Sequence, residues 1–218
     1  MRAILYVHGK GGNADECNFY KPLFKDCFVC GLDYKGNTPW QAGKEINSAV
    51  RNLKKEYDDV TIIAVSIGTY FTLHSEVDDL IDRAYFISPL IDMQRMINSL
   101  LTASRKTEAD LKRLKIIKTD FGEDLSWKYL SYVRKNPIRW NAKTFVLYAE
   151  KDELIPSETV YEFTVTHGAS LKVMKGGEHW FHTDNQLNFL SDWIFECEGH
   201  KKASETLAKE DIFINSEQ

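Results

Sequence analysis

Apolar residues occur along this chain in short runs, and each run ends in a glycine-rich, proline-containing or polar segment. Runs of this length that are rich in Val, Ile, Phe and Tyr are typical of strands buried on both faces. Six runs fit this description, at residues 3–7, 28–32, 60–65, 83–88, 144–149 and 170–174.

Segments with apolar residues at helical spacing separate these runs. The clearest begins at Pro39 and continues to about Tyr57, with Ala42, Ile46 and Val50 on one face. The alternation of strand and helix predicts an α/β fold, with a mostly parallel sheet and helices on both faces. All strands would then end at one edge, where open α/β sheets bind ligands. Further helices are expected at residues 16–25, 67–76 and 185–195.

The segment from Asp92 to Asn141 interrupts this alternation. It holds about fifty residues with no strand pattern, which is too long for an ordinary connection. We expect a helical insertion in a single domain of residues 1–198, and a crossover helix with long flanks is the alternative. Residues 199–218 form a charged tail. Helical spacing within the insertion covers residues 93–102, 107–118 and 125–135.

Length and composition are those of an ordinary globular protein. The 218 residues suffice for one domain with a sizeable core, and 43% of them are hydrophobic. The net charge of −4 gives no general attraction to nucleic acid or anionic membrane. No apolar stretch approaches the roughly 20 residues that span a bilayer, so no membrane insertion is expected. Residues 1–5 lead straight into a strand and leave no room for a signal peptide, which predicts a cytoplasmic protein.

The four cysteines, Cys17, Cys27, Cys30 and Cys197, are expected to be free thiols in that compartment. Cys27 and Cys30 have the spacing of a metal-binding pair, but they lie in a strand-like run and no second Cys or His pair stands nearby. The segment 9–12 lacks the spacing of a phosphate-binding P-loop. The sequence therefore predicts no metal, nucleotide or other cofactor.

The insertion is basic, whereas the rest of the chain is acidic. Residues 94–143 include twelve Lys or Arg and five Asp or Glu, a net charge of about +7. Such a surface could attract an anionic substrate, but its basic residues interleave with apolar ones, which favours a solvated helix face. Its aromatic residues could line an apolar acyl pocket or simply pack small helices, and they are Phe121, Trp127, Tyr129, Tyr132 and Trp140.

The run at residues 60–65 leads into a serine with the surroundings of a nucleophile. Ser66 is followed by Ile67, Gly68 and a helical pattern. A serine at a sharp strand-to-helix turn has its hydroxyl exposed beside backbone N–H groups. The small residues Ala64 and Gly68 permit the close approach of strand and helix that such a turn requires. This A-x-S-x-G motif departs mildly from the commoner G-x-S-x-G, and alone it is not specific.

Three other polar segments follow strand-like runs, at residues 8–12 (HGKGG), 150–156 (EKDELIP) and 175–180 (KGGEHW). Together with Ser66 they resemble the α/β-hydrolase family, in which oxyanion loop, serine, acid and histidine follow in this order. The resemblance extends from Met1 to about Glu198. It implies a minimal three-layer α/β/α sandwich of about six strands, with residues 92–141 as a small helical lid over the active site.

The resemblance also assigns the reacting side chains. Ser66 would be the nucleophile, His179 the base that activates it, and Asp152 the acid that holds the histidine in the correct tautomer. His182 is the serious rival to His179, although it is expected to cap or face the first turn of the last helix. The alternative acids are Glu150, Glu153 and Asp92. The remaining histidines fit less well, and they are His8, His74, His167 and His200.

A tetrahedral oxyanion needs two preorganised N–H donors. By the same resemblance these are the backbone groups of Ile67, directly after the nucleophile, and of Lys10, directly after His8 and Gly9. In so glycine-rich a loop, the backbone of Gly11 is an alternative donor.

The function expected is that of a metal-independent serine hydrolase. It would cleave an ester or thioester of a small to medium acyl group through an acyl-enzyme, with a small molecule as its substrate. A non-catalytic binding protein with the same fold is one alternative, and an acyltransferase or peptidase that uses the same triad is another. The sequence does not predict the oligomeric state.

Overall fold

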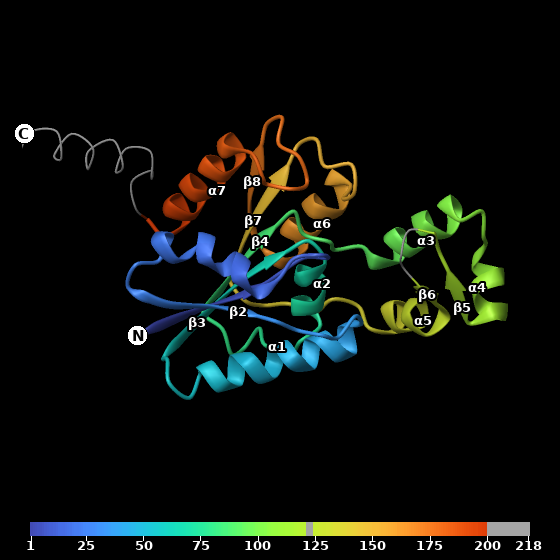
Figure 1. Ribbon diagram of the computed structural model, residues 1–218, viewed down its shortest axis with the longest axis horizontal. Coiled ribbons are helices and arrows are strands. Elements are labelled where there is room, and N and C mark those ends of the chain that lie inside the picture. The colour runs from blue at the N-terminus through green and yellow to red at the C-terminus, as the bar shows by residue number, and fades with distance from the viewer. Residues whose placement is uncertain (121–123, 200–218) are drawn as a thin grey trace, which may run out of the picture.

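The computed structural model describes residues 1–120 and 124–199 (Figure 1). Across these residues, six strands form one parallel sheet in the order β2-β1-β3-β4-β7-β8. The strands are β1 (Arg2–Val7), β2 (Cys27–Leu32), β3 (Asp59–Val65), β4 (Arg83–Ile87), β7 (Thr144–Ala149) and β8 (Ser170–Met174). The expected parallel sheet is confirmed, and the strand ends differ from the expected ones by one residue at most.

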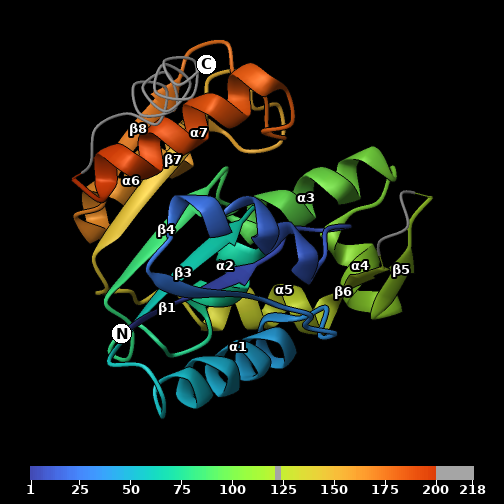
Figure 2. The same cartoon turned by 60° about the vertical axis from the view of Figure 1, so that its left-hand side comes forward.

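Helices lie on both faces of this sheet (Figures 1 and 2). An apolar core fills the space on each face. One core includes side chains from α1 (Pro39–Leu53), α2 (Ile67–Leu73) and α6 (Ser157–His167). The other includes side chains from α7 (Asp184–Cys197) and from the 3-10 helix η1 (Ala14–Phe19). Successive strand residues alternate between the cores, because side chains of a strand point to opposite faces in turn. The result is the expected three-layer sandwich.

One expected helix has a different form. Residues 16–25 do not make a single α-helix, since two 3-10 helices, η1 and η2 (Lys21–Leu23), occupy this region. Pro22 lies within η2, and a proline can neither donate the backbone hydrogen bond of an α-helix nor fit against the preceding turn. Elsewhere, α1 and α2 each end a few residues earlier than their apolar pattern suggests.

A helix lies in each of the three places expected in the insertion, but the one expected at residues 107–118 ends at Leu114, and residues 116–118 form a strand that was not expected. A short antiparallel hairpin pairs β5 (Ile116–Lys118) with β6 (Asp124–Ser126). Lys115 adopts a φ of 69°, which ends the preceding helix before the strand begins. Three-residue strands show too little alternation to be recognised, and here only the middle residue of each is buried. The helices are α3 (Met93–Ala103), α4 (Glu108–Leu114) and α5 (Trp127–Lys135).

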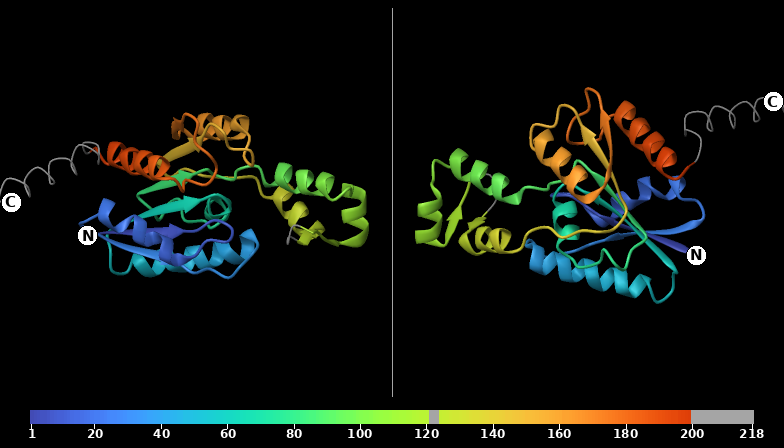
Figure 3. Two further views of the ribbon diagram at one scale, coloured as in Figure 1. Left: turned by 45° about the horizontal axis from the view of Figure 1, so that its top comes forward. Right: turned by 180° about the vertical axis from the view of Figure 1, so that it is seen from behind.

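Figure 3 shows the insertion at one end of the molecule, beyond the sheet. Its buried residues Leu111 and Leu130 belong to the same apolar core as α1, α2 and α6. Arg134 of α5 makes a two-pronged ion pair with Glu108 of α4, with both N–O distances at 2.6 Å. The ring of Trp40 in α1 lies 5.0 Å from that of Tyr132 in α5. The insertion is therefore packed internally and attached to the body through α5.

Several basic side chains of the insertion have partners within the molecule. Arg113 pairs with Asp110 at 3.1 Å. The Lys128 ammonium lies 4.9 Å from the centre of the Trp40 ring, where a cation–π interaction is favourable. Such contacts favour the interpretation of these basic residues as a solvated helix face over a role in attracting an anionic substrate. Of the aromatic residues of the insertion, Phe121 lies outside the described residues.

Other expectations concern thiols, membrane segments and the tail. Cys17, Cys27, Cys30 and Cys197 are free thiols. None of the helices in residues 1–120 and 124–199 is long and apolar enough to cross a bilayer. The charged tail, apart from Gly199, lies outside the described residues.

Packing of the insertion can be tested with two leucines. Leu130 is fully buried, whereas Leu114 is 47% exposed. Leu130→Ala should lower the free energy of unfolding by about 2–5 kcal/mol, because it removes buried methyl groups and leaves a cavity. Leu114→Ala should cost less than about 1 kcal/mol. Urea denaturation measures both values, and equally small losses would contradict the packing of α5 described above.

Candidate active site

Ser66 occupies a strained turn between β3 and α2. Its backbone has a φ of 50° and a ψ of −120°, a combination that few residues other than glycine adopt. Two backbone hydrogen bonds hold it there: the Ser66 N–H donates to the Ile87 carbonyl at 3.0 Å, and the Leu90 N–H donates to the Ser66 carbonyl at 3.1 Å. The side chain thereby reaches the edge at which the parallel strands end.

The residue two positions later must be glycine for this turn to form. A Cβ atom on Gly68 would lie 2.5 Å from the carbonyl oxygen of His8 and 2.7 Å from that of Val7. Both contacts are far shorter than van der Waals contact, and both involve backbone atoms that cannot move aside. The small residue expected at this position is thus explained by the close approach of α2 to the end of β1.

The glycine-rich loop after β1 lies beside Ser66. A Cβ on Gly9 would be 3.3 Å from the Ser66 Cβ, so the two backbones are close. The loop is held by His8, whose Nδ1 lies 2.8 Å from the Gly9 carbonyl and whose ring stacks on Tyr34 at 4.3 Å. The Tyr34 hydroxyl also donates to the His8 carbonyl at 3.0 Å. Lys10 therefore follows a loop segment that is fixed next to the serine.

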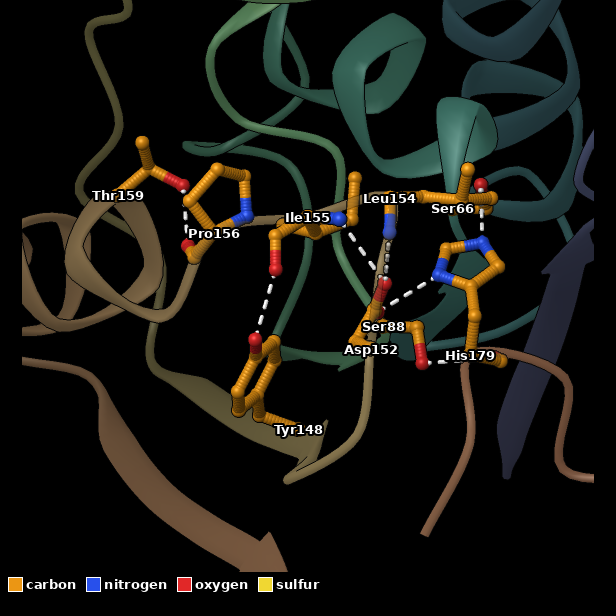
Figure 4. Close-up of polar contacts among 9 residues, drawn as sticks. All are labelled: Ser66, Ser88, Tyr148, Asp152, Leu154, Ile155, Pro156, Thr159 and His179. Atoms are coloured by element: carbon orange, nitrogen blue, oxygen red, sulfur yellow. Dashed lines mark hydrogen bonds and ion pairs between the residues drawn. The ribbon is translucent and has the colours of Figure 1, made fainter.

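His179 joins Ser66 to Asp152 (Figure 4). Its Nε2 lies 3.0 Å from the Ser66 Oγ, and its Nδ1 lies 2.7 Å from Asp152 Oδ2. A carboxylate can only accept, so Nδ1–H donates to Asp152, and in the neutral ring Nε2 then accepts from the serine hydroxyl. The His179 and Asp152 side chains are 5% and 0% exposed, which keeps water from competing for this bond.

The Asp152 carboxylate is fixed from its other side. Its Oδ1 accepts from the backbone N–H groups of Leu154 and Ile155, both at 2.9 Å. The Tyr148 hydroxyl donates to the Ile155 carbonyl at 2.7 Å and so fixes the same turn (Figure 4). The acid loop thus presents one carboxylate oxygen to the histidine and uses the other to order its own backbone.

The rival residues have other contacts. Glu150 accepts from the Gly176 N–H at 2.7 Å, and Asp92 accepts from the Arg95 N–H at 2.8 Å as the cap of α3. Glu153 is exposed. His182 contacts the Trp180 carbonyl through Nδ1 at 2.5 Å, and the cap of α7 is Thr183.

His74 and His167, like His8 described above, occupy structural positions. His74 ends α2, and burial lowers its pKa to about 4. His167 at the end of α6 contacts the Trp140 carbonyl through Nδ1 at 2.9 Å. His200 lies outside the described residues.

Two residues beside His179 were missed by the sequence reasoning. The Ser88 hydroxyl donates to the His179 carbonyl at 2.9 Å and ties the histidine loop to the end of β4 (Figure 4). Ser88 is fully buried and has a φ of 44°. Trp180 meets the His179 ring edge-on at 4.8 Å. A polar residue directly after a buried strand was the available signal for Ser88, because Ser66 was found in the same way.

The arrangement can carry out proton transfer at a serine hydroxyl. Asp152 orients the imidazole, and the imidazole can accept the Ser66 proton. Within residues 1–120 and 124–199, no three His, Cys, Asp or Glu side chains are grouped as a metal site requires. The chemistry that these side chains can perform is nucleophilic attack assisted by a general base.

Among known proteins, only solved structures are similar to this chain. No protein-family model matches the chain, and no curated protein sequence matches it. Among solved structures, Est1E from Butyrivibrio proteoclasticus is similar, with a TM-score of 0.72, 15% identity and coverage of 90% of this chain and 86% of its own. The mouse alpha/beta hydrolase domain-containing protein 10 has a TM-score of 0.69 and 14% identity, with 90% and 89% covered.

A third structure, XC6422 from Xanthomonas campestris, is described as an α/β serine hydrolase without a lid. Its TM-score is 0.59 at 12% identity, with 89% of this chain and 79% of that chain covered. At sequence identities this low, a structural similarity shows the fold and nothing about the activity. The order of the strands, the strained serine turn and these structural similarities together show that this protein has the fold of the α/β-hydrolase superfamily.

Proposed function

We propose that this protein is a serine hydrolase in which Ser66 attacks the acyl carbonyl of an ester or thioester. The observation that supports it most is the continuous hydrogen-bonded order of Ser66, His179 and Asp152, which come from three different loops. Structurally similar proteins described as hydrolases support the same class. The substrate is a small molecule, and the reaction is metal-independent: the side chains of Ser66, His179 and Asp152 carry it out.

In the proposed first step, the Ser66 oxygen attacks the carbonyl carbon while its proton passes to His179 Nε2. Asp152 holds the ring in the tautomer that leaves Nε2 free to accept, and its charge stabilises the imidazolium that forms. The same Nε2–H then protonates the leaving alcohol or thiol. An acyl group of small to medium size remains on Ser66, and a water molecule activated by His179 releases it.

The developing oxyanion would be stabilised by the backbone N–H groups of Ile67 and Lys10. Ile67 is the first residue of α2, and the first N–H groups of a helix have no partner within the helix. Gly9 lies against Ser66, which brings the following peptide near the reacting atoms. Gly11 remains the alternative donor in this loop.

The insertion of residues 92–141 would be a lid in this enzyme. It starts four residues after Ser88, which contacts the His179 loop, and it lies beyond the sheet in Figure 3. The acyl part of the substrate would then lie between the insertion and Ser66. Among the described residues, no contact favours the binding-protein, acyltransferase or peptidase alternatives over hydrolysis of an ester or thioester.

A fluorophosphonate probe tests the proposed nucleophile, because it reacts with serines activated by a base. The wild-type protein should be labelled, whereas Ser66→Ala and His179→Ala should not. Asp152→Asn should slow labelling by about 10⁴-fold, since the amide would favour the wrong tautomer. Ser99→Ala and His167→Gln are matched controls at a serine and a histidine that are not among the hydrogen-bond partners of the triad, and they should label like the wild type. Labelling that persists in Ser66→Ala would contradict the proposal.

The oxyanion donor at Lys10 can be tested through its backbone. Lys10→Ala and Lys10→Pro both remove the side chain, but only proline removes the N–H. We expect kcat/KM for an ester to be about 10²–10³-fold lower in the proline variant than in the alanine variant. Circular dichroism should first establish that both are folded. Equal rates would exclude this N–H and point to that of Gly11.

A further inference from the structure

A cavity of about 560 Å³ lies beside His179, on the face of the sheet that η1 and α7 cover. Its base is formed by residues at the carboxyl ends of three neighbouring strands, Tyr6 of β1, Val65 of β3 and Ile87 of β4. Val65 directly precedes Ser66, so the cavity begins next to the nucleophile. The triad mechanism does not account for a space of this size on this side of the histidine.

Aromatic side chains enclose the cavity and hold one another in place. The rings of Tyr6 and Tyr20 are 5.3 Å apart, and Phe19 meets Tyr20 edge-on at 5.0 Å. The Tyr6 hydroxyl donates to Glu16, which fixes the ring at the base. Trp180 closes the side nearest to His179. Ring pairs at these distances are stabilising, so the cavity is preorganised.

The charges along the cavity do not select a charged ligand. Lys10 and Glu16 both line it, and their charges are opposite. The rest of the surface is mainly apolar, and pockets of this composition and volume bind neutral apolar groups of small molecules. An anionic group such as a phosphate would meet the Glu16 carboxylate on the same wall.

The position of the cavity relative to His179 decides which part of a substrate the cavity can bind. His179 lines the cavity, and its Nε2, which lies 3.0 Å from the Ser66 Oγ, is the atom that would protonate the leaving group. In serine hydrolysis the histidine must protonate the departing oxygen or sulfur, so the leaving group lies on the side of the histidine. The insertion belongs to the core on the other face of the sheet, which leaves that face for the acyl part.

We propose that this cavity binds the leaving group of the substrate, and that this alcohol or thiol part carries a neutral aryl or alkyl group. The inference rests on the proposed hydrolase function and adds the chemical class of one half of the substrate. Leu187 of α7 lines the cavity and is half-buried. Because it takes no part in the Ser66–His179 contact, a larger side chain there should fill the cavity and leave that contact in place.

The test compares esters that differ in one half only. Benzyl acetate and hexyl acetate present a large leaving group, ethyl acetate a small one, and ethyl phenylacetate places the aromatic ring in the acyl part. The wild type should prefer benzyl or hexyl acetate to ethyl acetate by about 10-fold or more. Leu187→Trp should remove this preference and change kcat/KM for ethyl acetate and ethyl phenylacetate by no more than about threefold. Val165→Trp, at an 83% exposed position of α6, is the control.

Different failures have different meanings. A loss confined to ethyl phenylacetate would overturn the proposal, because the cavity would then hold the acyl part. An equal loss for all four esters would also overturn it, because Leu187 would then affect the fold and not the leaving group. Titration with a small fluorophosphonate separates these results from failure of the hydrolase function, in which the wild type itself would not be labelled. If Leu187→Trp does not fold, Phe19→Ala enlarges the same cavity and should raise the relative rate for naphthylmethyl acetate, and an unchanged ratio would overturn the proposal.

Discussion

The close approach of α2 to the end of β1 determines the geometry of the whole site. Because Gly68 has no side chain, the first turn of α2 can lie against the carbonyl groups of Val7 and His8. This contact places the loop after β1 beside Ser66 and forces the serine backbone into its strained conformation. Strain of this kind costs about 1–3 kcal/mol and persists only when surrounding bonds oppose its release. Here the neighbouring strand β4 supplies them, through Ile87 and through Leu90 just beyond its end.

A parallel sheet then solves the problem of assembling residues that are far apart in sequence. Ser66 and His179 are separated by 113 positions, yet each follows a strand whose carboxyl end lies at the same edge. The strand that precedes Asp152 lies between those that precede Ser88 and His179. Hydrogen bonds from Ser88 to the His179 loop and from the acid loop to its own carboxylate remove the remaining freedom. The site is therefore rigid because it is built on the ends of a rigid sheet.

The sequence alone was sufficient to predict those elements whose local pattern agrees with the global fold. The six strands are buried apolar runs, and Ser66, Asp152 and His179 each lie in the segment that follows one of them. The strands and the edge at which these segments meet could therefore be predicted, and the family resemblance named the residues. The hairpin β5–β6 could not, because its strands are three residues long and only Ile117 and Leu125 are buried in them. Ser88 follows β4 as Ser66 follows β3, but its role, one hydroxyl that donates to a distant carbonyl, corresponds to no known motif. The cavity depends on how η1 and α7, two segments at opposite ends of the described chain, are placed on one face of the sheet, and no local pattern encodes that placement.

The division of the interior into two cores has a consequence for how such a protein can change over time. Ile62 and Ile63 are consecutive, yet they belong to different cores, because the sheet backbone stands between them. A substitution in one core shifts neighbours within that core, and distant sites without shared partners behave nearly independently. Substitutions near α7 and substitutions near the insertion can therefore accumulate independently of one another. If the two faces bind the two halves of a substrate as proposed, such a fold can acquire a new preference for one half while it retains the old preference for the other.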